Sequence, residues 1–572
     1  MGNGRKHKLA VLSDEDCWLL FGRRALEHRS AEERLALEKT GREIVKKCGG
    51  VPLTAKTIGS VMLMNWWMEK DTIVNLWVAH GFISSNESEE EKIGERHFND
   101  LLSQSLLQDA ELHDDKNIRR CKMHDLVHDL AQFVAGSNCS VVEIGKQALS
   151  MNINNVHHSL LIFSHEAGDE TNEADEMASI LATRHKAQKL QTLLIKSTNS
   201  WGHHRVSQNL FQRLRCIRAL DFESYQHWEI AYISGTGIGR LTGLRTLTNF
   251  VVGVGDEECK CEELKHLNYL QGRLQITGLK NVRSRDEARE AELYNMQNLH
   301  ALFFKYNDDD AELLDDEVKR MEDVLEILQP HTNLKEFEIY DYKVSKLPKW
   351  IEDPAFCNLV RVKLWYCDKC KQLPGLGKLP SLKYLEIMNM EEVIKVGGEF
   401  RGNDDNEGSD GLVSFPKLET LIFWNMPNLE WELSGGDGEV MPSLLHLTIY
   451  DCIKLELPSN LPPLLQKLVL NLSNEGMSSG RLLRILPSLK HLMIAYSLDL
   501  TSLPGGWLGQ LKALQTLETV SYGRLGSLPE ELQQLTMLQE LTIRRCPLLE
   551  ERYRDGREDG TRLLISPISH FI

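Results

Sequence analysis

Residues 50–57 come within one residue of the phosphate-binding pattern Gly-x-x-x-x-Gly-Lys-Ser/Thr, with Ala55 standing where the second glycine belongs. Such a loop follows a buried strand and presents free backbone N–H groups to phosphate oxygens. Residues 50–57 instead follow a segment that is predicted to be helical, and Pro52 has no N–H group. We therefore do not expect this segment to cradle a phosphate.

Two histidines, His124 and His128, lie one helical turn apart and are each followed by an aspartate. This spacing could direct two imidazoles at one metal ion. A metal site also needs a third ligand, and a catalytic one needs a carboxylate base, but the sequence offers no recognisable motif for either. We expect His124 instead to lie at the start of a helix, where the N-terminus favours nearby anions.

A third candidate is the pair Cys367-x-x-Cys370, which could contribute two thiolates to a zinc site. No second pair follows at zinc-finger spacing. Cys367, Cys452 and Cys546 each come three residues after the last apolar position of a repeated pattern described below. At that position of such a repeat a small, buried polar side chain supports the turn that leaves the strand. The structural role is the favoured interpretation.

Composition argues for a protein-binding chain rather than a nucleic-acid or membrane protein. The 572 residues carry 66 Lys+Arg against 83 Asp+Glu, a net charge of −17, which disfavours contact with phosphate backbones and anionic lipids. No apolar run is long enough to span a bilayer, and no signal-peptide core is present at the start. We expect a cytoplasmic or nuclear protein with its 12 cysteines as free thiols.

The first part of the chain reads as helices and one hairpin. Amphipathic helices are predicted at residues 31–48, 73–82 and 93–107, followed by a polar hairpin up to Arg120 and a helix that opens at Met123. This order suggests a winged-helix-like module. The basic recognition face that a DNA-binding winged helix needs is not visible in the sequence, so we expect no nucleic-acid partner.

The rest of the chain repeats the pattern Leu-x-x-apolar-x-apolar. Most copies begin about 21 to 26 residues apart, the period of leucine-rich repeats, and two wider gaps hold acidic insertions. One such unit cannot bury its apolar face alone, whereas a stack makes a continuous core and an exposed sheet. Clear copies begin at Leu299, Leu334, Leu359, Leu382, Leu418, Leu444, Leu465, Leu489 and Leu538.

These features together resemble plant intracellular immune receptors of the nucleotide-binding, leucine-rich-repeat class, in their coiled-coil subclass. The resemblance is carried by four ordered motifs at residues 12–21, 44–55, 76–82 and 123–131, the last being the Met-His-Asp motif, and by the repeats that follow. In that family a coiled coil and a domain with the phosphate loop precede the first motif. Neither is seen before Leu12, and the stretch between Ile58 and Glu69 is short for the family, so we expect a truncated member.

The resemblance implies an α/β fold: an irregular, horseshoe-like repeat solenoid preceded by a helical-bundle remnant and a winged-helix-like domain. The expected domains are residues 1–64 (bundle remnant), 65–165 (winged helix with the Met-His-Asp motif), 166–552 (repeats) and 553–572 (C-terminal tail). The resemblance also implies that Pro52 contacts the adenine of ADP and that His124 contacts its phosphates. Intact members bind ADP or ATP, but for this chain we expect no cofactor, no metal and no enzymatic activity.

The expected function is recognition, by a plant innate immune receptor, of a pathogen effector or a guarded host protein through the repeat sheet. Contact with nucleotide-binding domains, in the same or another chain, is a further possible partnership. Two alternatives stay open: an ADP/ATP switch completed by a longer product, and a non-signalling repeat adaptor. The expected partner-binding residues are the x positions Glu336, Lys363, Trp365, Glu386, Glu419, His446, Lys490 and Glu540, together with Trp424. The two tryptophans could either pack a ridge or lie on a binding face, and the second is favoured because exposed aromatic side chains anchor interfaces.

Overall fold

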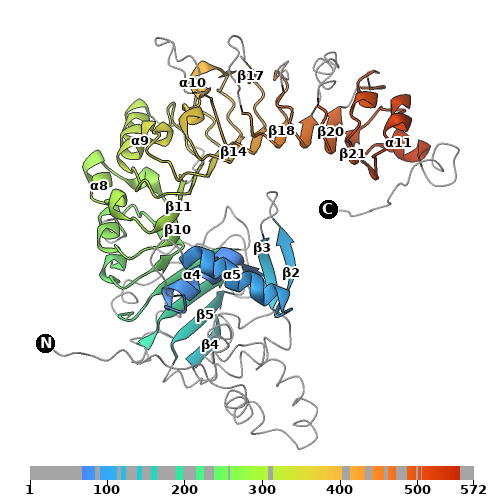
Figure 1. Cartoon of the computed structure of the whole chain (residues 1–572). Helices are drawn as coiled ribbons and strands as arrows, with labels where there is room; N and C mark the ends of the chain where they lie inside the picture. The colour runs from blue at the N-terminus through green and yellow to red at the C-terminus, as the bar shows by residue number, and fades with distance from the viewer. Residues whose placement is uncertain are drawn as a thin grey trace, which may run out of the picture. The chain divides into compact units, whose positions relative to one another are not determined.

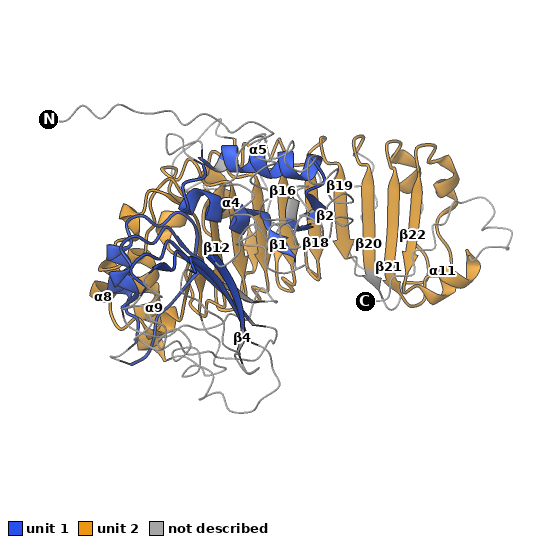
Figure 2. Cartoon of the chain, turned by 90° about the horizontal axis from the view of Figure 1, so that it is seen from below, with its two compact units in different colours: residues 1–274 blue, residues 275–572 orange. Residues whose placement is uncertain are grey.

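The computed structural model divides into two compact units, residues 1–274 and 275–572, and each is described by itself (Figures 1 and 2). The residues that the structure describes are 67–83, 90–112, 118–123, 138–144, 156–163, 189–197, 214–224, 237–255, 258–306, 314–401, 413–431, 441–455, 461–471, 486–497, 500–503 and 506–553. All statements below concern these residues.

The first unit contains a small module of two helices and a three-stranded antiparallel sheet. Helix α4 (Lys70–Ala79) ends where Gly81 adopts a φ of 73°, and α5 (Glu90–Ser103) packs against it. Strands β2 (Leu107–Leu112) and β3 (Ile118–Met123) form the hairpin, and β1 (Met68–Glu69) pairs with β3. Their shared core includes Ile73, Val74, Trp77, Phe98 and Met123. The predicted winged-helix architecture is confirmed.

A five-stranded sheet with parallel pairing follows in the same unit. Its order is β4 (Cys139–Ile144), β5 (His158–Phe163), β6 (Thr192–Ser197), β7 (Ala219–Ser224) and β8 (Thr246–Leu247). Repeat-type pairing thus begins at residue 139, earlier than the expected boundary at residue 166. Strand β6 follows the leucine spacing with Leu190, Leu193 and Ile195, whereas Ser140 in β4 and Ser159 in β5 stand at the position of Leu193 and hide the spacing there.

Helix α4 lies against this sheet through one small apolar cluster and one polar contact. Leu76 and Ala79 pack on Ala219 and Leu194. Next to them, the Nε2 atom of His80 is 2.6 Å from the hydroxyl oxygen of Thr192, and His158 Nδ1 lies 3.0 Å from the same oxygen. The His80 and His158 rings meet edge to face, with centroids 5.0 Å apart. One threonine hydroxyl therefore joins two imidazoles at the junction of the helix and the sheet.

The second unit is a stack of parallel strands that pair in register (Figure 1). At each strand two apolar side chains point into the core: Phe337 and Ile339, for example, are almost fully buried, and so are Val362 and Leu364 on the next strand. The strands are β11 (Leu299–Lys305), β12 (Glu336–Tyr340), β13 (Arg361–Trp365), β14 (Tyr384–Met388), β16 (Thr420–Trp424), β18 (His446–Tyr450), β19 (Lys467–Asn471), β20 (His491–Ser497), β21 (Thr516–Tyr522) and β22 (Glu540–Arg544). The predicted repeat solenoid is confirmed.

Short helices return the chain on the side of the core opposite to the exposed face of the sheet (Figure 1). A recurring contact joins them, in which a glutamate of one repeat accepts backbone N–H groups of a neighbouring repeat: Glu326 accepts from Lys349 at 2.9 Å, and Glu531 from Gly506 at 2.5 Å. The remaining elements are α8 (Arg285–Arg289), α9 (Asp315–Ile327), α10 (Gly398–Arg401), α11 (Pro547–Arg552), the strands β9 (Asn249–Val251), β10 (Gly272–Thr277), β15 (Lys395–Val396) and β17 (Glu430–Trp431), and the 3₁₀ helices η3 (Ile238–Arg240), η4 (Cys261–His266), η5 (Leu279–Asn281), η6 (Leu293–Asn295), η7 (Lys349–Glu352), η8 (Leu376–Lys378), η11 (Leu508–Gln510) and η12 (Glu530–Gln534).

The three repeat cysteines have the predicted structural role. Cys367, Cys452 and Cys546 are buried, and each thiol donates to the carbonyl oxygen of the residue two positions earlier, at 3.6, 3.3 and 3.2 Å. Burial raises the pKa of the Cys452 thiol to about 12, so it stays protonated and able to donate. Among the described residues, no group of three or more His, Cys, Asp or Glu side chains could hold a metal ion.

His80 makes the first unit sensitive to acid. Burial, together with the charges of Arg218 and Arg245, lowers the pKa of this imidazole from 6.5 to about 4. Between pH 6.5 and 4 the His80 imidazole is therefore protonated in the unfolded chain but neutral in the folded chain. Protonation favours the unfolded chain, so the free energy of unfolding decreases as the pH falls through this window. The shift corresponds to about 3 kcal/mol at most.

We predict that α4 amides lose hydrogen-exchange protection between pH 6.5 and 4, after correction for the intrinsic exchange rate. In a His80→Gln variant, which has no imidazole to protonate, this share of the pH dependence should disappear. Equal pH slopes in the variant and the wild type would contradict the assignment to His80.

Candidate functional site on the outer face of the repeat sheet

The face of the sheet that looks away from the core is built from every second residue of each strand. Because side chains alternate along a strand, the outward residues of β12 are Glu336, Glu338 and Tyr340. Pairing in register places equal positions of successive strands side by side, so outward residues form rows across the sheet. We call the last of these the exit row, which comprises Tyr340, Trp365, Met388, Trp424 and Tyr450.

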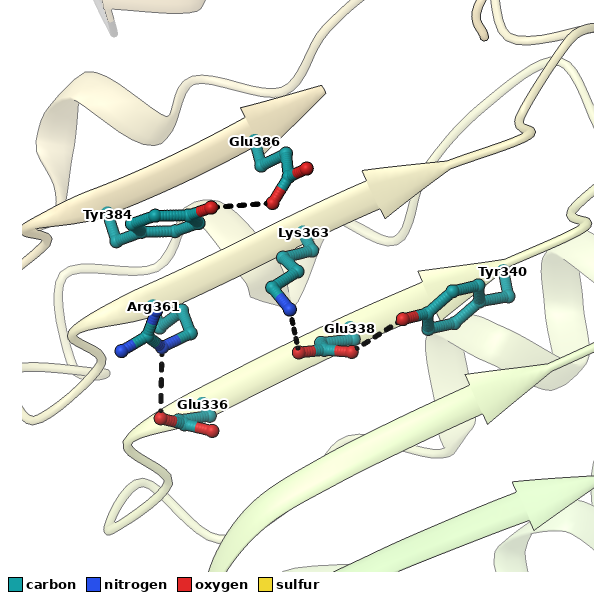
Figure 3. Close-up of polar contacts among 7 residues, drawn as sticks. All are labelled: Glu336, Glu338, Tyr340, Arg361, Lys363, Tyr384 and Glu386. Atoms are coloured by element: carbon teal, nitrogen blue, oxygen red, sulfur yellow. Dashed lines mark hydrogen bonds and ion pairs between the residues drawn. The ribbon is translucent and has the colours of Figure 1, made fainter. Parts of the chain in front are cut away.

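Ion pairs connect the outward residues of β12 and β13 (Figure 3). Arg361 donates to Glu336 at 3.0 Å, and Lys363 lies 2.9 Å from Glu338. The second pair is the more buried one, since the side chains of Lys363 and Glu338 are 19% and 5% exposed. Glu338 also accepts the hydroxyl of Tyr340 at 2.9 Å. These contacts hold the charged side chains of this region in fixed positions.

Strand β14 continues the network with an aromatic hydroxyl (Figure 3). Tyr384 donates to Glu386 at 2.7 Å, while the guanidinium of Arg361 lies 4.7 Å from the centre of the Tyr384 ring. One strand back, the ammonium of Lys363 lies 5.1 Å from the centre of the Trp365 ring. The outer face therefore already holds two cations over aromatic rings.

The exit row is the aromatic edge of this face. Tyr340 and Trp365 meet edge to face with centroids 4.9 Å apart, and Trp424 stacks on Tyr450 at 4.3 Å with an interplanar angle of 25°. Met388 pairs with both Trp365 and Trp424 in register and so links the two aromatic pairs. Trp424 remains 39% exposed, a large value for an indole.

A polar row borders the aromatic one, where each strand turns away from the sheet. The residue after the strand has a positive φ in β12, β14, β16 and β18, namely Asp341, Asn389, Asn425 and Asp451. Asn and Asp tolerate this left-handed region better than other side-chain-bearing residues. Within this row Asn425 donates to Asn389 at 2.5 Å, and Asp451 accepts from Asn471, the last residue of β19.

The structure places the predicted partner-binding residues in two different positions. Seven of them are outward strand residues: Glu336, Lys363, Trp365, Glu386, Trp424, His446 and Glu540. Glu419 and Lys490 instead precede β16 and β20 by one residue, and Glu419 pairs with Lys383 at 2.7 Å. The difference arises because the outward position is the residue directly before the second apolar one. Their role in binding stays a prediction.

Sequence reasoning missed Tyr340, Met388 and Tyr450 of the exit row. The signal was present, since each occupies the same place as Trp365 and Trp424, directly after the last apolar residue of the pattern.

Pro52 and His124 lie outside the described residues, and the nucleotide contacts that the resemblance implied for them stay a prediction. No helix in the described part of the chain is long and apolar enough to cross a membrane.

Comparison with known proteins identifies both parts of this architecture. Residues 64–131 match the family described as "Disease resistance protein Winged helix domain", and residues 261–390 match "R13L1/DRL21 LRRs". The chain is 29% identical to "Disease resistance protein RGA2" of Solanum bulbocastanum and 28% identical to "Putative disease resistance protein RGA1" of the same plant, over 88% and 93% of its length. Both matched regions and these relatives are those of plant disease resistance proteins, which the chain therefore resembles along most of its length.

A third member of this family, "Putative disease resistance RPP13-like protein 1" of Arabidopsis thaliana, is 26% identical over 80% of the chain and 54% of its own length. The chain spans 59% and 60% of the two Solanum relatives. The first family match includes α4, α5 and the β2–β3 hairpin, and the second includes strands β11 to β14 with their ion pairs.

The ion pairs of the outer face should differ in their effect on stability. We predict that Lys363→Ala lowers the free energy of opening of β12 and β13 by about 1–3 kcal/mol, because it leaves the nearly buried Glu338 carboxylate without this cation. Lys383→Ala removes a half-exposed pair with Glu419 and should cost under about 1 kcal/mol.

Hydrogen exchange of the strand amides, compared between the two variants, measures both effects. The second substitution is the matched control, since it also removes one lysine that is paired with a glutamate of a neighbouring repeat. Equal losses would show that burial of Glu338 does not make the first pair special.

Proposed function

We propose that this chain provides the partner-recognition part of a plant innate immune receptor, which binds another protein through the outer face of its repeat sheet. The observation that supports this most strongly is the exit row, an aromatic edge beside positioned charged side chains. Interfaces are enriched in Trp, Tyr and Arg, which carry most of the binding energy at a few central positions. The named relatives are disease resistance proteins.

The geometry favours a protein partner over a small molecule or a nucleic acid. The face continues across many paired strands and is a surface rather than an enclosed pocket. The net charge of −17 opposes binding to a phosphate backbone. A pathogen effector or a guarded host protein is the proposed partner, and its binding is the proposed trigger of defence. This role requires no catalytic residue in the sheet.

We predict that Trp365→Ala combined with Trp424→Ala weakens partner capture at least about tenfold, because a truncated interface tryptophan costs on the order of 2 kcal/mol. The measurement is a pairwise interaction screen of the chain against secreted pathogen proteins and leaf proteins, followed by titration of each hit. Tyr269→Ala with Tyr294→Ala is the matched control, since both tyrosines are exposed but lie outside the paired strands.

The two double variants separate a specific face from general stickiness. Loss of binding in the tryptophan variant alone supports the proposed surface. Hits that bind both variants as tightly as the wild type would place the recognition surface elsewhere in the chain.

A further inference from the structure

The two tryptophans of the exit row stand in different electrostatic surroundings. The ring of Trp365 already has the ammonium of Lys363 at 5.1 Å from its centre, and its edge contact with Tyr340 covers a further part of it. Trp424 stacks on Tyr450, and none of the cation–ring contacts found among the described residues involves Trp424. It is also the exposed one, at 39%.

The aromatic pair lies between two carboxylates. Glu386 pairs with Ile422 in register, so it lies one strand away and one outward position before Trp424. Such diagonal neighbours are about 7–8 Å apart, within reach of one long side chain. On the other side, Asp451 directly follows Tyr450, and its carboxylate accepts from Asn471. Both anions can favour a positive charge over the stacked rings.

We propose that Trp424, stacked on Tyr450 between Glu386 and Asp451, is the binding site for a cationic side chain of the partner protein, either an arginine or a lysine. This proposal rests on the proposed function, because it names the chemistry of one contact on the same face. The face of an aromatic ring attracts cations through its quadrupole, and Trp gives the strongest attraction. Arginine also stacks flat on a ring and is less strongly hydrated than lysine.

The neighbouring strands show that this geometry works in the same protein. Arg361 lies over Tyr384 and Lys363 over Trp365, in each case with a glutamate at hydrogen-bond or ion-pair distance from the cation. The Trp424 position repeats the ring and the nearby carboxylates without a lysine or arginine of its own strand, since the outward residues of β16 are Thr420, Ile422 and Trp424. A partner's side chain would supply the cation.

The test uses two labelled octapeptides of alternating residues as probes, one of arginine and leucine, the other of citrulline and leucine. Citrulline has nearly the shape of arginine but no charge. We expect the arginine peptide to bind the full chain more tightly, measured by fluorescence anisotropy at two salt concentrations. Trp424→Leu, which keeps apolar bulk but removes the ring, should weaken its binding about five- to thirtyfold.

Two further variants distinguish binding at Trp424 from non-specific attraction of a basic peptide to an acidic chain. Trp424→Phe retains a weaker ring and should give an intermediate loss, whereas Tyr294→Leu, at an exposed tyrosine outside the sheet, should change nothing. Hydrogen exchange of β14 and β16 confirms that each variant keeps its fold. Arginine binding that is unchanged in Trp424→Leu, equal binding of the two peptides, or no binding of either overturns the proposal.

The natural partner separates this proposal from the proposed function. Capture of a partner could depend on Trp424 and yet survive replacement of each arginine and lysine in the partner's contact segment by glutamine. In that case the proposed cation site is wrong, but the proposed recognition face is still supported. If capture is independent of both tryptophans, the recognition face itself fails. Capture that falls on replacement of a single arginine or lysine, and only in the presence of Trp424, supports both.

Discussion

In-register pairing of parallel strands is the constraint on which the rest of this structure depends. Successive repeats align Phe337 with Val362, and that valine with Leu385, so apolar side chains of equal position stack into one core. The same register fixes the opposite face, where neighbouring side chains lie about 4.8 Å apart whether or not they suit one another. A repeat that slipped by one residue would bury its charges and expose its leucines. The core therefore determines which residues can meet on the surface.

The leucine spacing made the fold of the second unit predictable, because the pattern marks the two buried positions of each strand. The repeat that contains β21 was not recognised in the sequence because Thr519 occupies the place of the last apolar residue. It is fully buried, and its hydroxyl donates to the carbonyl oxygen of Thr542 at 3.5 Å, so a polar residue fits where the pattern demands an apolar one. In the first unit β6 keeps this spacing, but β4 and β5 were less predictable because Ser140 and Ser159 stand where Leu193 stands in β6.

The candidate site was predictable by position but not by interaction. Alternation along a strand is a property of the sequence, and it was enough to choose Lys363 and Trp365 as outward residues. It failed by one residue at Glu419 and Lys490, because the strand's outward phase starts directly before the second apolar position. Which glutamate pairs with which cation depends on strand neighbours that are about 25 residues apart in the chain. The sequence does not record such contacts in a local pattern.

The outer face combines fixed and open positions, and this division bears on how it could recognise a partner. Lys363 is held by Glu338, so a partner that used this lysine would first have to separate a largely buried pair, which costs more than it returns. Trp424 and Tyr450 are already stacked, so contact with them demands little further ordering of side chains. Affinity is therefore best gained at the exposed aromatic edge. In the proposed role, the paired charges beside it would act mainly by excluding partners whose own charges do not match.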